Sequence, residues 1–277
     1  MSIEAPYPEL DEYLAWMGEA GWRISEIEAS EGAAGNISVC MGWPVELRRK
    51  FPNAETLELP LAVPELAGMT LIITGSGRRL RDIIQEPTAN LGCLVVDPGG
   101  KTGQLYTSPK RLFANLTSEL NSHLAVHRDQ IVHTGTNFDA VVHAQPRHLT
   151  FLSHIPRYRD EKYLNQHLLR WEPETIINLP EGVSFVPFNV PGSQALMSAT
   201  LEKLHHHRVV IWAKHGVVAR SDTSVKRASD RVEYAETAAS YEYLNLTVAA
   251  SGEQAEGLTV DEIQAICKAF NIQQSIF

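Results

Sequence analysis

The sequence lacks any apolar run near the roughly 20 residues that a membrane-spanning helix needs. It has only three cysteines, Cys40, Cys93 and Cys267, an odd and sparse set that argues against a disulfide scaffold and favours a reducing compartment. Residues 1–11 include acids but no base, unlike a secretory signal or a transit peptide. We therefore expect a cytoplasmic protein with no membrane partner.

Basic residues are also scarce, with 24 Lys and Arg against 33 Asp and Glu and a net charge of −9. Binding to nucleic acid usually needs a basic face, so no nucleic-acid partner is expected. One tight basic cluster consists of Arg78, Arg79 and Arg81, with Asp82 beside it. A cluster of this size could hold a small anion.

The chain of 277 residues is 44% hydrophobic and 21% charged, which excludes a disordered polypeptide. Segments with helical and strand patterns alternate without a clear linker or repeat, which predicts one α/β domain over residues 1–277. Residues 42–68 contain several prolines and are expected to be an insertion or a long connection. Helices are expected over 13–27, 118–131, 192–206, 222–249 and 259–270, and strands over 37–41, 71–74, 91–96, 139–143, 183–188, 208–213 and 217–220.

Two glycine turns each adjoin a predicted strand, Gly35-Asn36 and Gly75-Ser76-Gly77. Glycine lets backbone N–H groups approach an anion closely, and Asn or Ser adds a side-chain donor. Thr117-Ser118 precedes a predicted helix, whose first N–H groups also attract anions. Each feature alone is compatible with an ordinary turn, but together they suggest a site for an anionic ligand.

Glu119, His123 and His127 recur at every fourth position, so a helix would place them on one face. A metal site can be built from such a row, and a solvated helix face can look the same. We favour a structural role for the two histidines. Glu119 lies at the helix start, where the helix dipole favours a carboxylate that can still face a cleft.

Two further histidines follow apolar strands, His143 after Ala140-Val141-Val142 and His215 after Val209–Trp212. A histidine at the end of a buried strand is held rigidly, which suits a metal ligand. A histidine satisfied within the core would give the same pattern, so both interpretations stay open at this point.

Taken in order along nearly the whole chain, these pieces resemble the class II aldolase/adducin family. The resemblance implies an α/β fold with a mostly antiparallel central sheet flanked by helices, assembled as a homotetramer. It also implies a lyase of carbohydrate metabolism that cleaves a ketose 1-phosphate, with rhamnulose 1-phosphate the expected example, into dihydroxyacetone phosphate and an aldehyde. The motifs that carry it are Gly35-Asn36, Thr74–Gly77, Ala89–Gly92, Thr117–Leu120, Val142-His143, Trp171-Glu172, Pro180–Val183, Val190–Gly192 and His215-Gly216.

The resemblance further implies a divalent metal, Zn²⁺, that stabilises the enediolate left when the carbon–carbon bond breaks. Glu119 matches the glutamate that moves the proton, and Glu174 matches a second active-site glutamate. The positions that match metal ligands are His143, Gln145 and His215, and those at the phosphate of the sugar are Gly35, Asn36, Gly75, Ser76, Thr117 and Ser118.

Two positions depart from the family pattern. Gln145 stands where a second zinc histidine belongs, and an amide oxygen suits zinc less well than imidazole. Ala33 replaces an asparagine that contacts phosphate. His148 is the one nearby histidine that could move in to replace Gln145. The sequence thus leaves open a metal-dependent aldolase, a non-catalytic oligomeric scaffold or sugar-phosphate binder, and a sugar-phosphate epimerase of the same fold.

Overall fold

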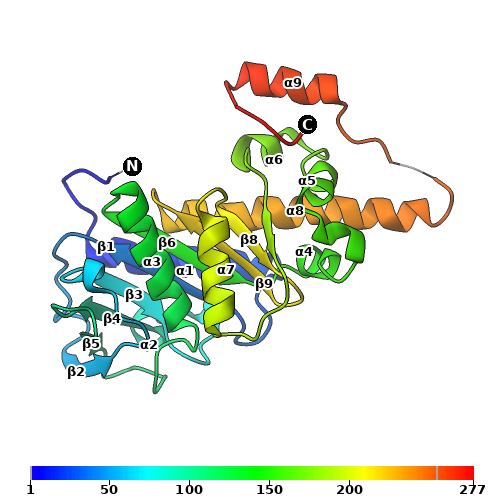
Figure 1. Cartoon of the computed structure of the whole chain (residues 1–277). Helices are drawn as coiled ribbons and strands as arrows, with labels where there is room; N and C mark the ends of the chain where they lie inside the picture. Colours follow the sequence, from blue (N-terminus) through cyan, green and yellow to red (C-terminus); the bar gives the residue numbers. More distant parts are fainter. Residues whose placement is uncertain (1, 254) are drawn as a thin grey trace.

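A nine-stranded sheet forms the centre of the computed structural model, which describes residues 2–253 and 255–277 (Figure 1). The strand order is β2-β5-β4-β3-β1-β6-β9-β8-β7, and every neighbouring pair is antiparallel except β7 and β8. The strands are β1 (Asn36–Met41), β2 (Asn53–Glu58), β3 (Thr70–Thr74), β4 (Leu91–Val96), β5 (Thr102–Thr107), β6 (Phe138–Ala144), β7 (Ser184–Val186), β8 (Val209–Trp212) and β9 (Gly216–Ser221).

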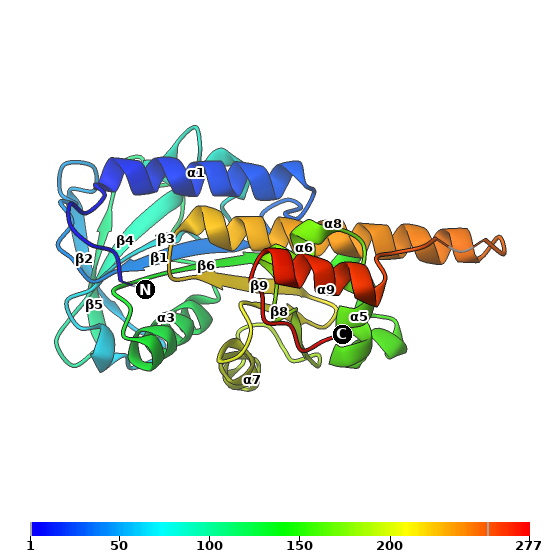
Figure 2. The ribbon, with the colours of Figure 1, turned by 90° about the horizontal axis from the view of Figure 1, so that it is seen from above.

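Helices cover both faces of this sheet. Figure 2 shows α1 (Leu10–Glu26) and α8 (Val225–Ala249) on one face and α3 (Leu120–Thr134) and α7 (Gln194–Leu204) on the other. The mixed α/β fold with a mostly antiparallel sheet flanked by helices is therefore confirmed. The remaining helical segments are η1 (Pro64–Leu66), η2 (Leu80–Asp82), α2 (Pro87–Asn90), α4 (Arg147–Leu152), η3 (Pro156–Arg159), α5 (Glu161–Leu168), α6 (Pro173–Asn178) and α9 (Val260–Ala269).

The two central strands, β1 and β6, are buried along their whole length, and their side chains alternate between the helical layers. On β1, Ile37 and Val39 join the core cluster that includes residues of α1, and the intervening Ser38 contacts side chains of α3. The strands are paired with Asn36 opposite His143. This register places the polar residues of β1 and β6 on the α3 side of the sheet.

Several expectations about the elements need correction. The supposed connection over 42–68 contains the edge strand β2, whose residues are almost all exposed, and η1. Strand β5 and the helices α4, α5 and α6 were not predicted. The helix expected from residue 118 begins at Leu120 with Glu119 as its N-cap.

The described part of the chain contains no helix that is both long and apolar enough to cross a membrane.

Candidate active site

Three side chains with metal-binding atoms converge at one end of the central strands. Glu119 caps α3, His143 lies near the end of β6, and His215 lies in the turn between β8 and β9. One ligand atom of each lies within 4.8 Å of the others. The fold thus brings together Glu119 and His215, which are 96 positions apart in the sequence.

Both imidazoles present a ring nitrogen to the carboxylate of Glu119. His143 Nδ1 donates to the carbonyl oxygen of Val217 at 2.8 Å, which leaves Nε2 free 3.6 Å from Glu119 Oε2. His215 Nε2 lies 3.7 Å from Glu119 Oε1. Burial and the neighbouring His143 ring lower the pKa of His215, against the opposing effect of Glu119. His215 is therefore neutral at pH 7 and can offer a lone pair.

This donor set fits a divalent cation. A histidine that binds a metal through one ring nitrogen usually donates from the other to a backbone carbonyl, as His143 Nδ1 does to Val217. Two imidazoles and a carboxylate are ligands that zinc accepts, and three protein ligands leave a position open for substrate. His143 and His215 are the residues that could hold such an ion, with the Glu119 carboxylate beside them.

A cleft of about 210 Å³ opens beside these residues. Arg78 also lines the cleft and adds a positive charge, so one member of the basic cluster reaches the site. Ala33 lines it too, at the position where the family pattern has asparagine. Every residue expected at the phosphate lies on its wall: Gly35, Asn36, Gly75, Ser76, Thr117 and Ser118.

Gln145 lines the cleft but is already hydrogen bonded to another group. With its nitrogen assigned to the side that faces Glu31, the Gln145 amide donates to Glu31 Oε1 at 2.6 Å. His148 does not join the site, because its ring and its backbone N–H both contact Glu236 Oε1, at 2.8 and 2.9 Å. Metal binding by Gln145 stays a prediction, and the movement of His148 into the site is not supported.

A second pocket of about 570 Å³ adjoins the cleft, and Gln145 and His215 line both. Its wall also includes Glu31, Arg147 and Lys214, so it offers charges of both signs. A ligand in the cleft could therefore extend past His215 into a polar pocket.

Glu174 is exposed on α6 and lines neither of these two cavities. Its predicted role as a second active-site glutamate is therefore not explained by the arrangement within one copy of the chain.

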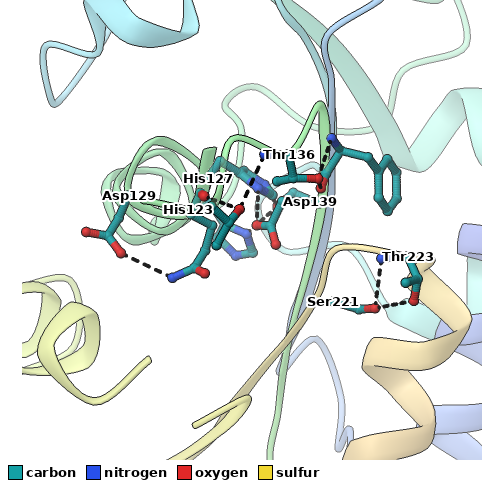
Figure 3. A network of polar contacts seen from close by, with 11 residues as sticks. His123, His127, Asp129, Thr136, Asp139, Ser221 and Thr223 are labelled. Carbon is teal, nitrogen blue, oxygen red and sulfur yellow. Dashed lines mark hydrogen bonds and ion pairs between the residues drawn. The ribbon is translucent and has the colours of Figure 1, made fainter. Parts of the chain in front are cut away.

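His123 and His127 are almost fully buried, so the solvated-face alternative for this helix row is wrong. They lie between α3 and β6, where His127 Nδ1 is 2.7 Å from Asp139 Oδ2 (Figure 3). Both rings also contact Ser38 Oγ, at 2.6 Å from His123 and 2.7 Å from His127. Ser38 and Asp139 were missed as functional candidates, and their one signal is a polar side chain within a mostly apolar, buried strand.

The comparison with protein families decides the classification. The model of the class II aldolase and adducin N-terminal domain matches residues 17–243. The chain belongs to this family.

Related proteins agree with that assignment. The rhamnulose-1-phosphate aldolase of Bacteroides thetaiotaomicron is 27% identical over 94% of this chain and 92% of its own length. That of Klebsiella pneumoniae subsp. pneumoniae is 29% identical over 78% of this chain and 76% of its own. Among solved structures, a sugar-phosphate aldolase from Thermotoga maritima superposes with a TM-score of 0.72 at 29% identity, over 89% of this chain and 98% of that one. Family and relatives support an enzyme of the aldolase class.

Proposed function

We propose that this class II aldolase cleaves a ketose 1-phosphate, with rhamnulose 1-phosphate the first candidate, into dihydroxyacetone phosphate and an aldehyde. The observation that carries the proposal is the convergence of Glu119, His143 and His215 beside a cleft walled by glycine turns and hydroxyl side chains. The names of the related aldolases support the choice of substrate.

The cleft offers a place for the phosphate group. The hydroxyl-bearing residues Ser76, Thr117 and Ser118 line it together with the positively charged Arg78, and hydroxyl donors and positive charge favour a dianion. A ketose anchored there by its phosphate would direct its carbonyl end toward His143 and His215. The remainder of the sugar would then extend into the adjoining pocket.

Glu119 is the group placed to move a proton. Its Oε2 accepts from Asn36 Nδ2 at 2.8 Å, which leaves Oε1 for the substrate. In the cleavage, the bond between C3 and C4 breaks and its electron pair stays on the phosphorylated fragment. The C4 hydroxyl loses its proton as the aldehyde forms, and one proton returns to C3 to give dihydroxyacetone phosphate. A carboxylate buried beside the site suits this transfer.

A divalent cation held by His143 and His215, with Gln145 and Glu119 beside them, would supply positive charge where negative charge develops on the ketose oxygens. We propose Zn²⁺, since imidazole is a ligand that zinc prefers.

The test is a retro-aldol assay on purified protein loaded with Zn²⁺ or Mn²⁺, in which dihydroxyacetone phosphate is reduced by glycerol-3-phosphate dehydrogenase and NADH oxidation is followed. Glu119→Gln should lower kcat by about 10²- to 10⁴-fold, the usual contribution of a general acid or base. Glu65→Gln, at an exposed position of η1, is the matched control and should keep full activity. Absence of both bound metal and turnover after supplementation would refute the proposal.

A second candidate is a sugar-phosphate binder without catalysis, which the contact of Gln145 with Glu31 favours because it occupies the amide. Gln145→His distinguishes the two. In a binder, the new imidazole should tighten zinc binding and create turnover where there was none. In a working aldolase, the same change should alter or abolish an activity that already exists.

Assembly and location belong to the same proposal. We propose that the chain forms a homotetramer and that Glu174 acts in an active site of this assembly. We also propose a cytoplasmic location, which agrees with the three unpaired cysteines. Light scattering measures the mass, and Glu174→Gln should lower kcat while leaving that mass unchanged.

A further inference from the structure

A chain of buried hydrogen bonds runs from Glu119 away from the cleft into the protein. Glu119 Oε2 accepts from Asn36 Nδ2, and Asn36 Oδ1 contacts His123 Nε2. Ser38 Oγ then links His123 Nδ1 to His127 Nε2, and His127 Nδ1 reaches Asp139 Oδ2. The six side chains are between 0% and 7% exposed, so water does not compete with these contacts.

The fold explains why these groups meet. Asn36 and Ser38 are two residues apart on β1 and share a face, as do Asp139 and His143 on β6. Glu119, His123 and His127 lie four residues apart along α3 and face the same layer. Figure 3 shows His127 and Asp139 between this helix and the sheet.

The amide of Asn36 sets the direction of every bond in the chain. A carboxylate can only accept, so the NH₂ group faces Glu119 and the amide oxygen faces His123. That oxygen also only accepts, so His123 must carry its hydrogen on Nε2. Burial lowers the pKa of His123 well below the usual value, and the nearby His127 and His143 lower it further. His123 is therefore neutral, and its bare Nδ1 accepts from Ser38.

The hydrogen positions at the other end of the chain of hydrogen bonds follow in the same way. Because Ser38 has one hydrogen and gives it to His123, its oxygen must accept from His127 Nε2–H. His127 Nδ1 then shares a proton with Asp139, either as imidazolium with carboxylate or as imidazole with carboxylic acid. Burial raises the pKa of Asp139, against the opposing effects of His127 and Arg220. Both forms leave the hydrogen on Nε2 of His127.

We propose that four buried side chains act as positioning residues for the reaction: Ser38, His123, His127 and Asp139. By keeping one proton on the His127–Asp139 pair, they hold the Asn36 amide with its N–H toward Glu119. The inference rests on the proposed function in that Glu119 is the group positioned. Without that proton, His127 would donate from Nδ1 and every bond in the chain would reverse. The Asn36 oxygen would then face the Glu119 carboxylate, and two acceptors would repel each other.

The first test does not depend on activity. Imidazole ¹⁵N spectra of the metal-free protein at pH 7 should show hydrogen on Nε2 of both histidines and a bare Nδ1 on His123. Assignments come from the loss of signals in His123→Gln and His127→Gln. A His123 ring with its hydrogen on Nδ1, or a charged His123, would overturn the inference.

The second test removes the middle link. Ser38→Ala should lower kcat about 10-fold, change KM less than about 3-fold and mix the tautomers of His123, because only the orientation of Asn36 is lost. Ser122→Ala is the matched control: this hydroxyl is also buried, adjoins His123 on α3 and has no hydrogen-bond partner in the described structure. The control should match wild type in kcat and in its spectra.

A third variant separates positioning from general stability. Asp139→Asn can still donate a hydrogen to His127 Nδ1 and should keep kcat within about 3-fold, whereas Asp139→Ala should lose activity as Ser38→Ala does. Unchanged kcat and tautomers in Ser38→Ala would refute the role. If no variant and no wild-type protein turns over substrate, the proposed function fails, and the wild-type spectra alone decide this inference.

Discussion

Replacing Gly35 by alanine should damage the site as well as lower stability. Gly35 has a φ of +84°, in the left-handed region, and an added Cβ would lie 2.8 Å from the carbonyl oxygen of His143. The backbone conformation costs a residue with a side chain about 1–2 kcal/mol. The contact adds the cost of overpacking, about 1–3 kcal/mol, because a backbone carbonyl cannot rotate away as a flexible side chain would.

Gly32 provides the matched control in the same loop. It also has a positive φ, +58°, but an added Cβ there would meet nothing within 4 Å. Gly32→Ala should therefore lose only about 1–2 kcal/mol of the free energy of unfolding, and Gly35→Ala about 2–5 kcal/mol. The difference between the two variants isolates the contact with His143.

Urea unfolding followed by circular dichroism gives the two free energies, and calorimetric titration with Zn²⁺ gives the metal affinity. Because the displaced carbonyl belongs to His143 itself, Gly35→Ala should also weaken zinc binding, whereas Gly32→Ala should not. Equal stability losses in the two variants, with unchanged zinc affinity in both, would refute the steric reasoning.

Two further predictions concern titratable groups away from the cleft. Burial raises the pKa of the thiols of Cys40 and Cys93, so Ellman's reagent should react with Cys267 alone in the native protein and with all three cysteines in guanidinium chloride. Burial acts to raise the pKa of the Glu161 carboxyl, but hydrogen bonds from Lys203 and from neighbouring groups lower it by more. The net result is a folded pKa below the usual value of 4.5. A carboxylate whose pKa is lower in the folded than in the unfolded protein stabilises the fold at pH values above its unfolded pKa. This stabilisation is lost as the pH falls through the folded pKa. Glu161→Gln should thus cost about 1–2 kcal/mol at pH 7, with the gap in urea midpoints closing between about pH 5 and 3; a constant gap would contradict this.

The central sheet was predictable where its strands are buried on both faces. Leu91–Val96 and Val209–Trp212 are rich in apolar residues and adjoin turn residues, so their type was clear from the sequence. Strand β2 was missed because Asn53–Glu58 is exposed almost throughout and has no apolar alternation. It is a strand because it pairs with β5, a tertiary contact that its own residues do not indicate.

The candidate site was predictable in part, and for two different reasons. His143 and His215 stood out at strand ends, but only the family resemblance chose metal ligands over core histidines. Ser38 and Asp139 could not be linked to Glu119 from the sequence, because the contacts span up to 89 residues and depend on the register of β1 against β6. A one-residue shift in that register would turn the polar side chains to the opposite face.

The two outer strands of the sheet have a consequence for self-association. A free sheet edge is a template for pairing with another chain, and long, apolar edges promote aggregation. Here one edge, β7, is three residues long, and the other, β2, carries the exposed carboxylates of Glu55 and Glu58. A second copy pairing along β2 would have to bury charged side chains, namely Glu58 and the Glu55–Arg111 ion pair, so both ends of the sheet are poor starting points for fibril growth.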